Sequence, residues 1–175
     1  MDMTGIEAGC GILVDGERSR EDRQSAAAAL RAVSTFAWAA VPGERRLELA
    51  ERLTGVLGNP NEDPELRAQT AGALKAAADE LPLEWHLKLF DVLANVIRDG
   101  ATRKLFPLMA ESCGLVSKLK VSACDDEPLL QRLNDAIFEA VLLRGATEDE
   151  SFAEPVDDAF GRTRNRINWL QGDRD

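Results

Sequence analysis

The sequence predicts an all-α protein, a short α-solenoid of about three antiparallel helix pairs followed by a C-terminal helix. Alanine and leucine dominate its 175 residues, whereas tyrosine is absent and phenylalanine and tryptophan are few. This composition favours helices over strands. Apolar residues also recur at helical spacing between stops made of proline and glycine, and one helical pattern occurs twice.

The duplicated pattern is the most specific of these observations. Residues 23–32 match residues 67–76 at an offset of 44 positions, and the apolar positions of residues 47–57 match those of residues 87–97 at an offset of 40. A repeat of that length built from two helices is typical of stacked helical arrays, whose usual role is binding. The repeat therefore indicates an architecture and a kind of function, without naming the partner.

The first helices are delimited by caps and breakers. Residues 1–18 are glycine-rich and acidic, and we expect them to form a flexible N-terminal leader. Ser19 then offers an N-cap for a long helix that reaches about residue 40, where Pro42 and Gly43 break it. A second helix is expected over about residues 44–57, before the Gly-Asn-Pro stop at residues 58–60.

The central helices carry the clearest signals. Asp63 is the expected cap of the third helix, with Pro64 at its first position, and this helix runs to about residue 81. The fourth helix covers residues 83–99 and ends at Gly100.

The remaining helices are less regular. Thr102 begins a fifth helix that carries Pro107, and Asp125 or Asp126 caps a sixth that ends near Gly145. We expect residues 146–156 to be an acidic linker and residues 157–170 a short amphipathic helix. The helix pairs are then 19–57, 63–99 and 102–144, which divides the chain into the leader (1–18), a repeat domain (19–145), and a linker with its helix (146–175).

One segment resembles a known family. Residues 63–67 (Asp-Pro-Glu-Leu-Arg), followed by Ala71, Leu74 and Ala77, resemble the first helix of a HEAT repeat, and the same rhythm recurs at residues 21–30. The resemblance covers residues 19–100 well and 101–145 poorly. HEAT and armadillo-like proteins serve as scaffolds that recognise protein surfaces or extended peptides, so the resemblance implies a binding role.

A polar strip marks the candidate binding surface. The helix over 83–99 is apolar around most of its circumference, which is typical of a helix that packs against several neighbours. Its polar positions align with those of the second helices of the other pairs, and together the candidate residues are Glu44, Glu48, Glu51, Glu84, Lys88, Asp91, Asn95, Arg98, Asp135 and Glu139. These residues either form an acidic ribbon that recognises a partner, or are only the solvated faces that every exposed helix needs.

The C-terminal segment supplies a second set of candidates. Arginine and tryptophan are favoured in interfaces, and the last helix carries Arg162, Arg164, Arg166 and Trp169. This helix either caps the last repeat within the same chain or docks on a partner, and the need of solenoid ends for a cover favours the first.

No catalytic or cofactor-binding arrangement is evident. His86 is the single histidine, which rules out a site with two histidine ligands and leaves one general-base candidate; a structural role beside Trp85 is favoured. Cys10, Cys113 and Cys124 are an odd number without a Cys-x-x-Cys pair, which indicates a reducing compartment rather than disulfides or zinc. We therefore expect a non-enzymatic protein with no metal or cofactor.

The charge limits the partners. A net charge of −10 argues against direct nucleic-acid binding, and neither a secretory signal nor a membrane-spanning run is evident, so we expect a cytoplasmic protein. Our leading hypothesis is a protein-binding adaptor or complex subunit that recognises a partner with a basic surface through the acidic strip. The alternative is an acidic inhibitor, an immunity protein or a nucleic-acid mimic, that occludes a basic site on its target.

Overall fold

The computed structural model describes residues 2–147 and 149–172, and every regular element among them is helical, which confirms the all-α class. Three short 3₁₀ turns accompany the α-helices. The helices are α1 (Met3–Val14), α2 (Arg20–Arg31), α3 (Thr35–Ala39), α4 (Gly43–Gly58), α5 (Pro64–Ala77), α6 (Leu83–Arg103), α7 (Phe106–Val116), α8 (Glu127–Leu142) and α9 (Glu150–Leu170).

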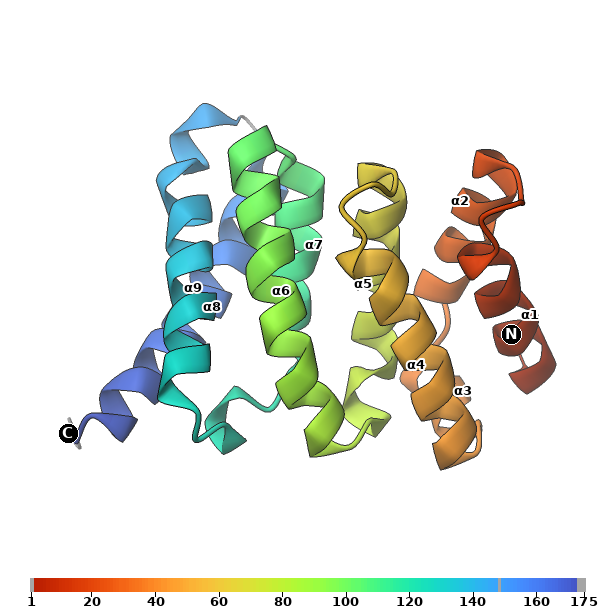
Figure 1. The fold of residues 1–175 in the computed structure, drawn as a ribbon, viewed down its shortest axis with the longest axis horizontal. Coiled ribbons are helices and arrows are strands. Elements are labelled where there is room, and N and C mark those ends of the chain that lie inside the picture. Colours follow the sequence, from red (N-terminus) through yellow and green to blue (C-terminus); the bar gives the residue numbers. More distant parts are fainter. Residues whose placement is uncertain (1, 148, 173–175) are drawn as a thin grey trace.

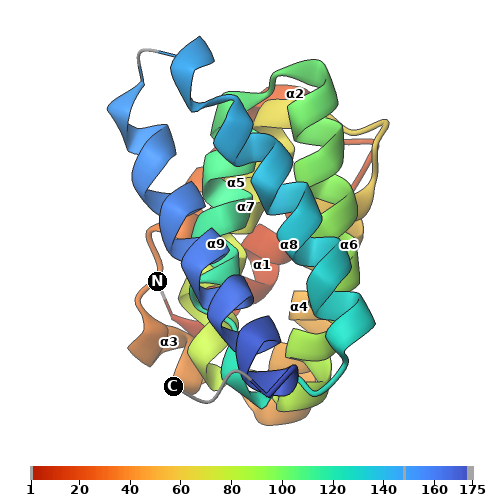
Figure 2. The ribbon, with the colours of Figure 1, turned by 90° about the vertical axis from the view of Figure 1, so that its left-hand side faces the viewer.

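The long helices stand side by side in two layers (Figure 1). One layer contains α1, α4, α6 and α8 in that order, and the other contains α2, α5, α7 and α9. Seen from the α8/α9 end, α6 and α8 lie on one side and α5, α7 and α9 on the other (Figure 2). Successive long helices alternate between the layers, so that each layer continues from the N-terminal to the C-terminal end of the molecule.

Three of the predicted caps are confirmed. Ser19, Asp63 and Asp126 each accept a hydrogen bond from the backbone N–H three residues on, at 3.1 Å, 3.1 Å and 2.9 Å. These bonds satisfy donors that the first turn of a helix leaves free, and they fix where α2, α5 and α8 begin. Pro64 is the first residue of α5 and Pro128 the second residue of α8, and proline is tolerated in the first turn of a helix.

The duplicated sequence pattern contains Arg23 and Arg67, and these two residues make equivalent hydrogen bonds. The Arg23 Nε donates to the carbonyl oxygen of Leu13 at 2.8 Å, and the Arg67 Nε donates to that of Leu57 at 2.9 Å. Each acceptor lies ten residues earlier, at the C-terminal end of the preceding long helix in the other layer. The same residue therefore joins the two layers at two successive places.

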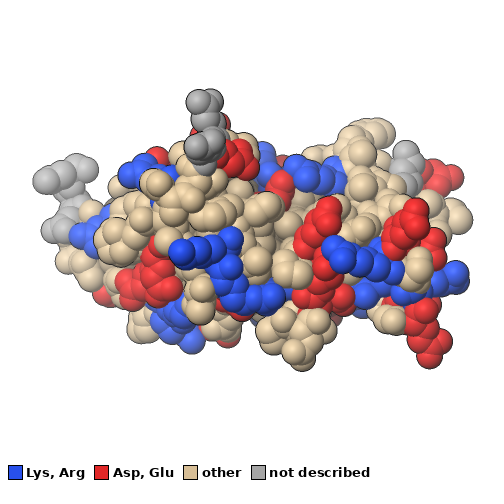
Figure 3. Space-filling model, turned by 90° about the horizontal axis from the view of Figure 1, so that it is seen from above, with Lys and Arg blue, Asp and Glu red and all other residues tan. Residues whose placement is uncertain are grey.

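Each of these arginines also forms an ion pair with a carboxylate farther along the chain. Arg23 makes two bonds to the Glu62 carboxylate, at 3.0 Å and 2.6 Å, and Arg67 pairs with Asp99 at 2.5 Å. Both side chains are buried, and their charges are compensated by these partners. Seen from above, acidic and basic side chains alternate over the N-terminal part of the molecule (Figure 3).

The core follows the apolar positions of the repeat. Leu49, Leu53 and Leu57 of α4 and their counterparts on α6, at an offset of 40, are all fully buried. Both helices present these residues to the opposite layer and to their neighbours, as expected for helices that are apolar around much of their circumference.

The expectation of a flexible leader over residues 1–18 is wrong. Residues 3–14 form α1, capped by Asp2, and Ile6, Cys10 and Leu13 make a fully buried stripe against the body. Their spacing of four and three residues is helical, but the glycines between them obscure it. Packing against α2 and α4 supplies the stability that the local sequence lacks.

The pairing of the helices is consequently shifted by one. The successive helices that pack together are α1 with α2, α4 with α5, α6 with α7, and α8 with α9, rather than the expected pairs 19–57, 63–99 and 102–144. The expected helix over 19–40 is also divided, because the chain leaves the helix after residue 31 and Ser34 caps the short α3.

Two further boundaries differ from the prediction. Gly100 does not end α6, which continues to Arg103 before Lys104 adopts a left-handed conformation with φ 57°. Gly100 instead permits close packing, since a Cβ there would lie 2.7 Å from Cγ of Met109 on α7. The expected linker over 146–156 is largely the start of α9, which accommodates Pro155 within its second turn.

Candidate functional site

The polar strip predicted from the sequence lies on one layer. Its residues on α4, α6 and α8 are all solvent-exposed, and these three helices are adjacent. The structure therefore brings together Glu44, Glu48, Glu51, Glu84, Lys88, Asp91, Asn95, Arg98, Asp135 and Glu139 on one face, here called the charged face.

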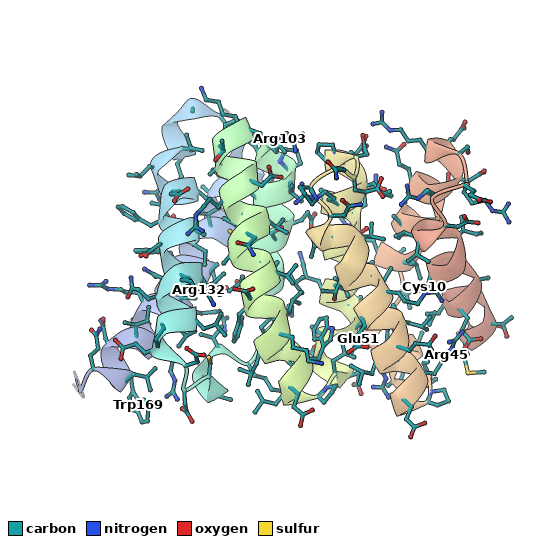
Figure 4. All side chains as sticks on the ribbon, in the orientation of Figure 1. Cys10, Arg45, Glu51, Arg103, Arg132 and Trp169 are labelled. Atoms are coloured by element: carbon teal, nitrogen blue, oxygen red, sulfur yellow. The ribbon has the colours of Figure 1, made fainter. Side chains whose placement is uncertain are left out.

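Ion pairs between the helices neutralise much of this face. Glu51 of α4 pairs with Lys88 of α6 at 3.6 Å, Asp91 of α6 with Arg132 of α8 at 3.0 Å, and Arg98 of α6 with Glu139 of α8 at 3.5 Å. Figure 4 shows Arg132 between α8 and α6.

Arg45 adds a further link on the same face. It pairs with Glu7 of α1 at 2.8 Å and also with Glu48. Arg45 and Arg132 were not among the candidate residues, because a contact between helices cannot be seen in the pattern of a single helix. Among the described residues, only Glu44, Glu84 and Asp135 of the predicted carboxylates have no ion-pair partner, so the face carries mixed charge.

The C-terminal candidates hold α9 to its own chain. The Arg166 Nε donates to the carbonyl oxygen of Cys124 at 2.9 Å, its terminal nitrogen pairs with Asp125 at 2.5 Å, and its guanidinium lies 4.1 Å from the centre of the Trp169 ring. Arg162 pairs with Asp158 on the same helix. Since α9 also packs on α7 and α8, the expected docking within the chain is confirmed.

A groove in the other layer is a stronger candidate for binding. It lies over α5, between α2 and α7, and reaches the start of α9, with a volume of about 520 Å³. Its floor is mostly apolar and its edge polar, with lining residues Arg31, Pro64, Glu65, Ala68, Gln69, Leu105, Pro107, Leu108, Ala110, Glu111, Asp149 and Ser151. A concave apolar surface with a few polar groups is the usual form of a binding site.

A strap of three charged residues crosses α5 at the end of this groove. Glu111 of α7 accepts ion pairs from Arg31 of α2 at 2.6 Å and from Lys75 of α5 at 3.5 Å. Gly72 makes room for the strap, since a Cβ there would lie 3.0 Å from Cδ of Arg31. The strap therefore fixes the spacing of the helices that form the groove.

Beyond the strap the depression continues with a different charge. A second cavity of about 310 Å³ shares Arg31 with the first and adds Lys75, Lys118 and Asp79. The first cavity is lined by three carboxylates (Glu65, Glu111 and Asp149) and one cation, Arg31, whereas the second has three cations, Arg31 included, and one carboxylate. The groove is therefore acidic toward the start of α9 and basic toward the end of α7.

One polar atom in the groove lacks a protein partner. Among the described residues, no donor lies within hydrogen-bonding distance of the buried carbonyl oxygen of the Gln69 side chain. An unsatisfied buried acceptor is unfavourable, by about 1–3 kcal/mol.

His86 and the cysteines are arranged for packing. The His86 ring is buried, with Nε2 3.1 Å from the carbonyl oxygen of Leu81, and Nδ1 accepts from the Lys120 backbone N–H at 3.3 Å. Burial lowers the pKa of His86, so the ring is neutral at pH 7. Burial also raises the pKa of Cys10 and of Cys113 to about 12, which leaves both thiols protonated.

The groove was not predicted from the sequence. It is formed by helices from three parts of the chain, and its floor depends on small residues of α5 that resemble ordinary core positions. The available signal was the run of Ala and Gly at residues 68, 72 and 76, because a helix face without large side chains leaves a depression between its neighbours.

Comparisons with known proteins support the fold alone. No protein-family model matches the sequence, and no curated protein matches it at a significant level. The chain is similar to the crystal structure of an engineered protein from a structural genomics consortium, with a TM-score of 0.61 and 18% sequence identity. The similarity covers 97% of this chain and 69% of the engineered chain.

Two searches of the described residues gave no site of another kind. No group of three or more His, Cys, Asp or Glu side chains there is arranged to hold a metal ion. Within the same part of the chain, no helix combines the length and apolarity needed to cross a membrane.

Proposed function

We propose that this protein is a short α-solenoid that acts as a non-enzymatic binding module and holds an extended segment of a partner protein in the groove over α5. The groove itself is the observation that carries this proposal. It combines an apolar floor with charged edges in one depression. The strap from Arg31 to Glu111 keeps the depression open by fixing the helices on both sides.

The lining of the groove indicates the chemistry of that segment. Leu105 and Leu108 suit an apolar side chain, and the nearby carboxylates of Glu65 and Asp149 favour a basic residue beside it. We therefore infer an extended segment with an apolar residue next to a basic one, in agreement with the basic partner expected from the net charge.

Two matched substitutions distinguish the groove from the charged face. Partners are isolated with the wild-type protein, and the affinity of each is then measured by calorimetry against Ala110→Arg in the groove and Asn95→Arg on the charged face. We expect Ala110→Arg to weaken binding by at least about tenfold, equivalent to 1.4 kcal/mol, and Asn95→Arg to have little effect. Circular dichroism confirms that both variants are folded.

The opposite result would assign the charged face as the binding surface. If Asn95→Arg abolished binding and Ala110→Arg did not, the function would rest on the strip that contains Glu48 and Asp91, as the sequence predicts. Equal affinities for all three proteins would exclude both surfaces.

A second candidate function is the acidic inhibitor. The net charge of −10 and the exposed carboxylates of Glu44, Glu84 and Asp135, which lack ion-pair partners among the described residues, favour it. An inhibitor of this kind would bind its basic target less tightly at high salt, because screening weakens attraction between exposed charges. Replacing the three carboxylates by lysine would then abolish binding, and Ala110→Arg would leave it intact.

The cysteines indicate the cellular compartment of the protein, and this inference is the same for both candidate functions. All three are free and buried. Unpaired thiols are typical of proteins in a reducing compartment, and we infer the cytoplasm.

A further inference from the structure

The last helix pair exposes an apolar surface. Phe138 and Leu142 of α8 are 46% and 68% exposed, although they lie one turn apart on the same face of the helix. The Phe138 ring lies 5.7 Å from that of Phe160 on α9, so the two helices share the surface. Phe138, Leu142 and Phe160 are called the C-terminal end face below.

The equivalent face of α6 is covered by the next helix of the same layer, α8. At an offset of 44 residues the two helices have nearly the same pattern of burial, and Ala94 and Arg98 correspond to Phe138 and Leu142. On α6 this face meets α8, since Ala94 is 2% exposed and Arg98 pairs with Glu139. No further helix of the described residues covers the equivalent face of α8.

The opposite end of the molecule contains a groove. A groove of about 400 Å³ lies between α1 and α2, and small side chains make up most of its wall. Its lining residues are Gly5, Ala8, Gly9, Ile12, Arg18, Asp22, Ser25, Ala26 and Ala29. This groove is called the N-terminal end groove below, and its small side chains leave room for the large apolar side chains of the C-terminal end face.

The charges at the two ends are also complementary. Arg164 of α9 is exposed and has no ion-pair partner among the described residues, whereas Asp22 of α2 lies on the edge of the N-terminal end groove. Both helices belong to the same layer. A second copy placed with its α1 and α2 against α8 and α9 would thus continue both layers and bring these opposite charges together.

We propose that the protein associates head to tail, with the C-terminal end face of one copy packed in the N-terminal end groove of the next. This contact uses two different surfaces, so each added copy leaves one free end of each kind. The average mass should therefore keep rising with concentration, without a plateau at the dimer. This inference does not depend on the groove over α5.

Sedimentation velocity on two blocked variants tests the proposal. Phe138→Glu with Leu142→Glu removes the C-terminal end face, and Ala29→Arg fills the N-terminal end groove from an exposed position. We expect each variant to be monomeric at concentrations where the wild type associates. An equimolar mixture should form dimers and nothing larger, because the one intact face and the one intact groove are used in the dimer and both remaining ends are blocked.

Phe36→Glu is the matched control. Phe36 is 86% exposed on α3 and is not part of either end surface, so its replacement should leave the association unchanged. A wild-type protein that stays monomeric up to millimolar concentration would overturn the proposal. So would an association that Ala29→Arg leaves intact, because two C-terminal end faces would then be packed against each other.

Discussion

At the scale of single residues, Arg23 and Arg67 explain why the sequence repeats. Each buried guanidinium satisfies a carbonyl at the C-terminal end of one helix and a carboxylate farther along the chain. An alanine at either position would remove the side-chain donor to the Leu13 or Leu57 carbonyl oxygen, and lysine lacks the planar group needed to reach both the carbonyl and the carboxylate. The sequence therefore repeats an arginine at these two positions because the same contact joins the two layers at both places.

Arg67→Ala should destabilise the protein by about 3 kcal/mol, because it leaves the buried Leu57 carbonyl oxygen without this donor and leaves the Asp99 carboxylate with only its longer ion pair to Arg103 among the described residues. Urea unfolding measures the change in the free energy of unfolding. Arg20→Ala is the control, since Arg20 pairs with Asp63 while its side chain is 63% exposed, and it should cost less than about 0.5 kcal/mol. Similar losses for the two variants would contradict the role given to Arg67.

His86 should make stability depend on pH in a narrow window. Its folded pKa lies below the ordinary value because of burial, so the unfolded chain binds a proton more readily. The free energy of unfolding should therefore fall as the pH drops below about 6.5, and the fall should end at the folded pKa. Unfolding at several pH values measures this, and NMR titration reports the pKa of the single imidazole directly.

His86→Gln supplies the control for this window. A side chain that does not titrate removes the slope between pH 7 and 5, whatever its effect on absolute stability. A variant with the same slope as the wild type would mean that other groups, such as carboxylates, cause it.

At the scale of elements, most long helices could be predicted, but α1 and the first half of α9 could not. Caps such as Asp63 and breakers such as Gly58 define α4 and α5 locally, so the sequence is sufficient there. In α1, by contrast, the glycines weaken the local preference, and only the burial of Ile6 and Leu13 against other helices stabilises the helix. The first half of α9 was missed for the related reason that Pro155 reads as a break.

The end of α6 offers a direct test of local strain. Lys104 occupies the left-handed region at φ 57°, which glycine adopts more readily than other residues. Lys104→Gly should therefore stabilise the protein by about 0.5–1 kcal/mol. The neighbouring Arg103→Gly should do the reverse, because residue 103 belongs to the helix. Thermal unfolding of the two variants separates these effects.

The ion pairs of the charged face should contribute little to stability. The Asp91 and Arg132 side chains are 52% and 61% exposed, and pairs between exposed groups are weak in water. A double-mutant cycle should give a coupling energy below about 0.5 kcal/mol. A coupling several times larger would mean that the charged face helps to hold α6 and α8 together.

At the scale of the whole molecule, the arrangement of the layers decides which surfaces can bind. The charged face could be predicted because its residues recur along single helices. The groove over α5 could not, because Arg31, Gln69 and Glu111 come from three helices whose packing depends on the corrected pairing. The same correction, which makes α1 part of the array, also produces the N-terminal end groove.

The most direct test of the proposed function is to map the bound partner on the protein by NMR. Amide shifts of labelled protein, carrying Phe138→Glu and Leu142→Glu to prevent association, are compared with and without a partner peptide. We expect the largest changes in α2, α5 and α7 around Gln69 and Ala110, with small changes in α4, α6 and α8. Changes centred on Glu48, Asp91 and Glu139 instead would contradict binding in the groove.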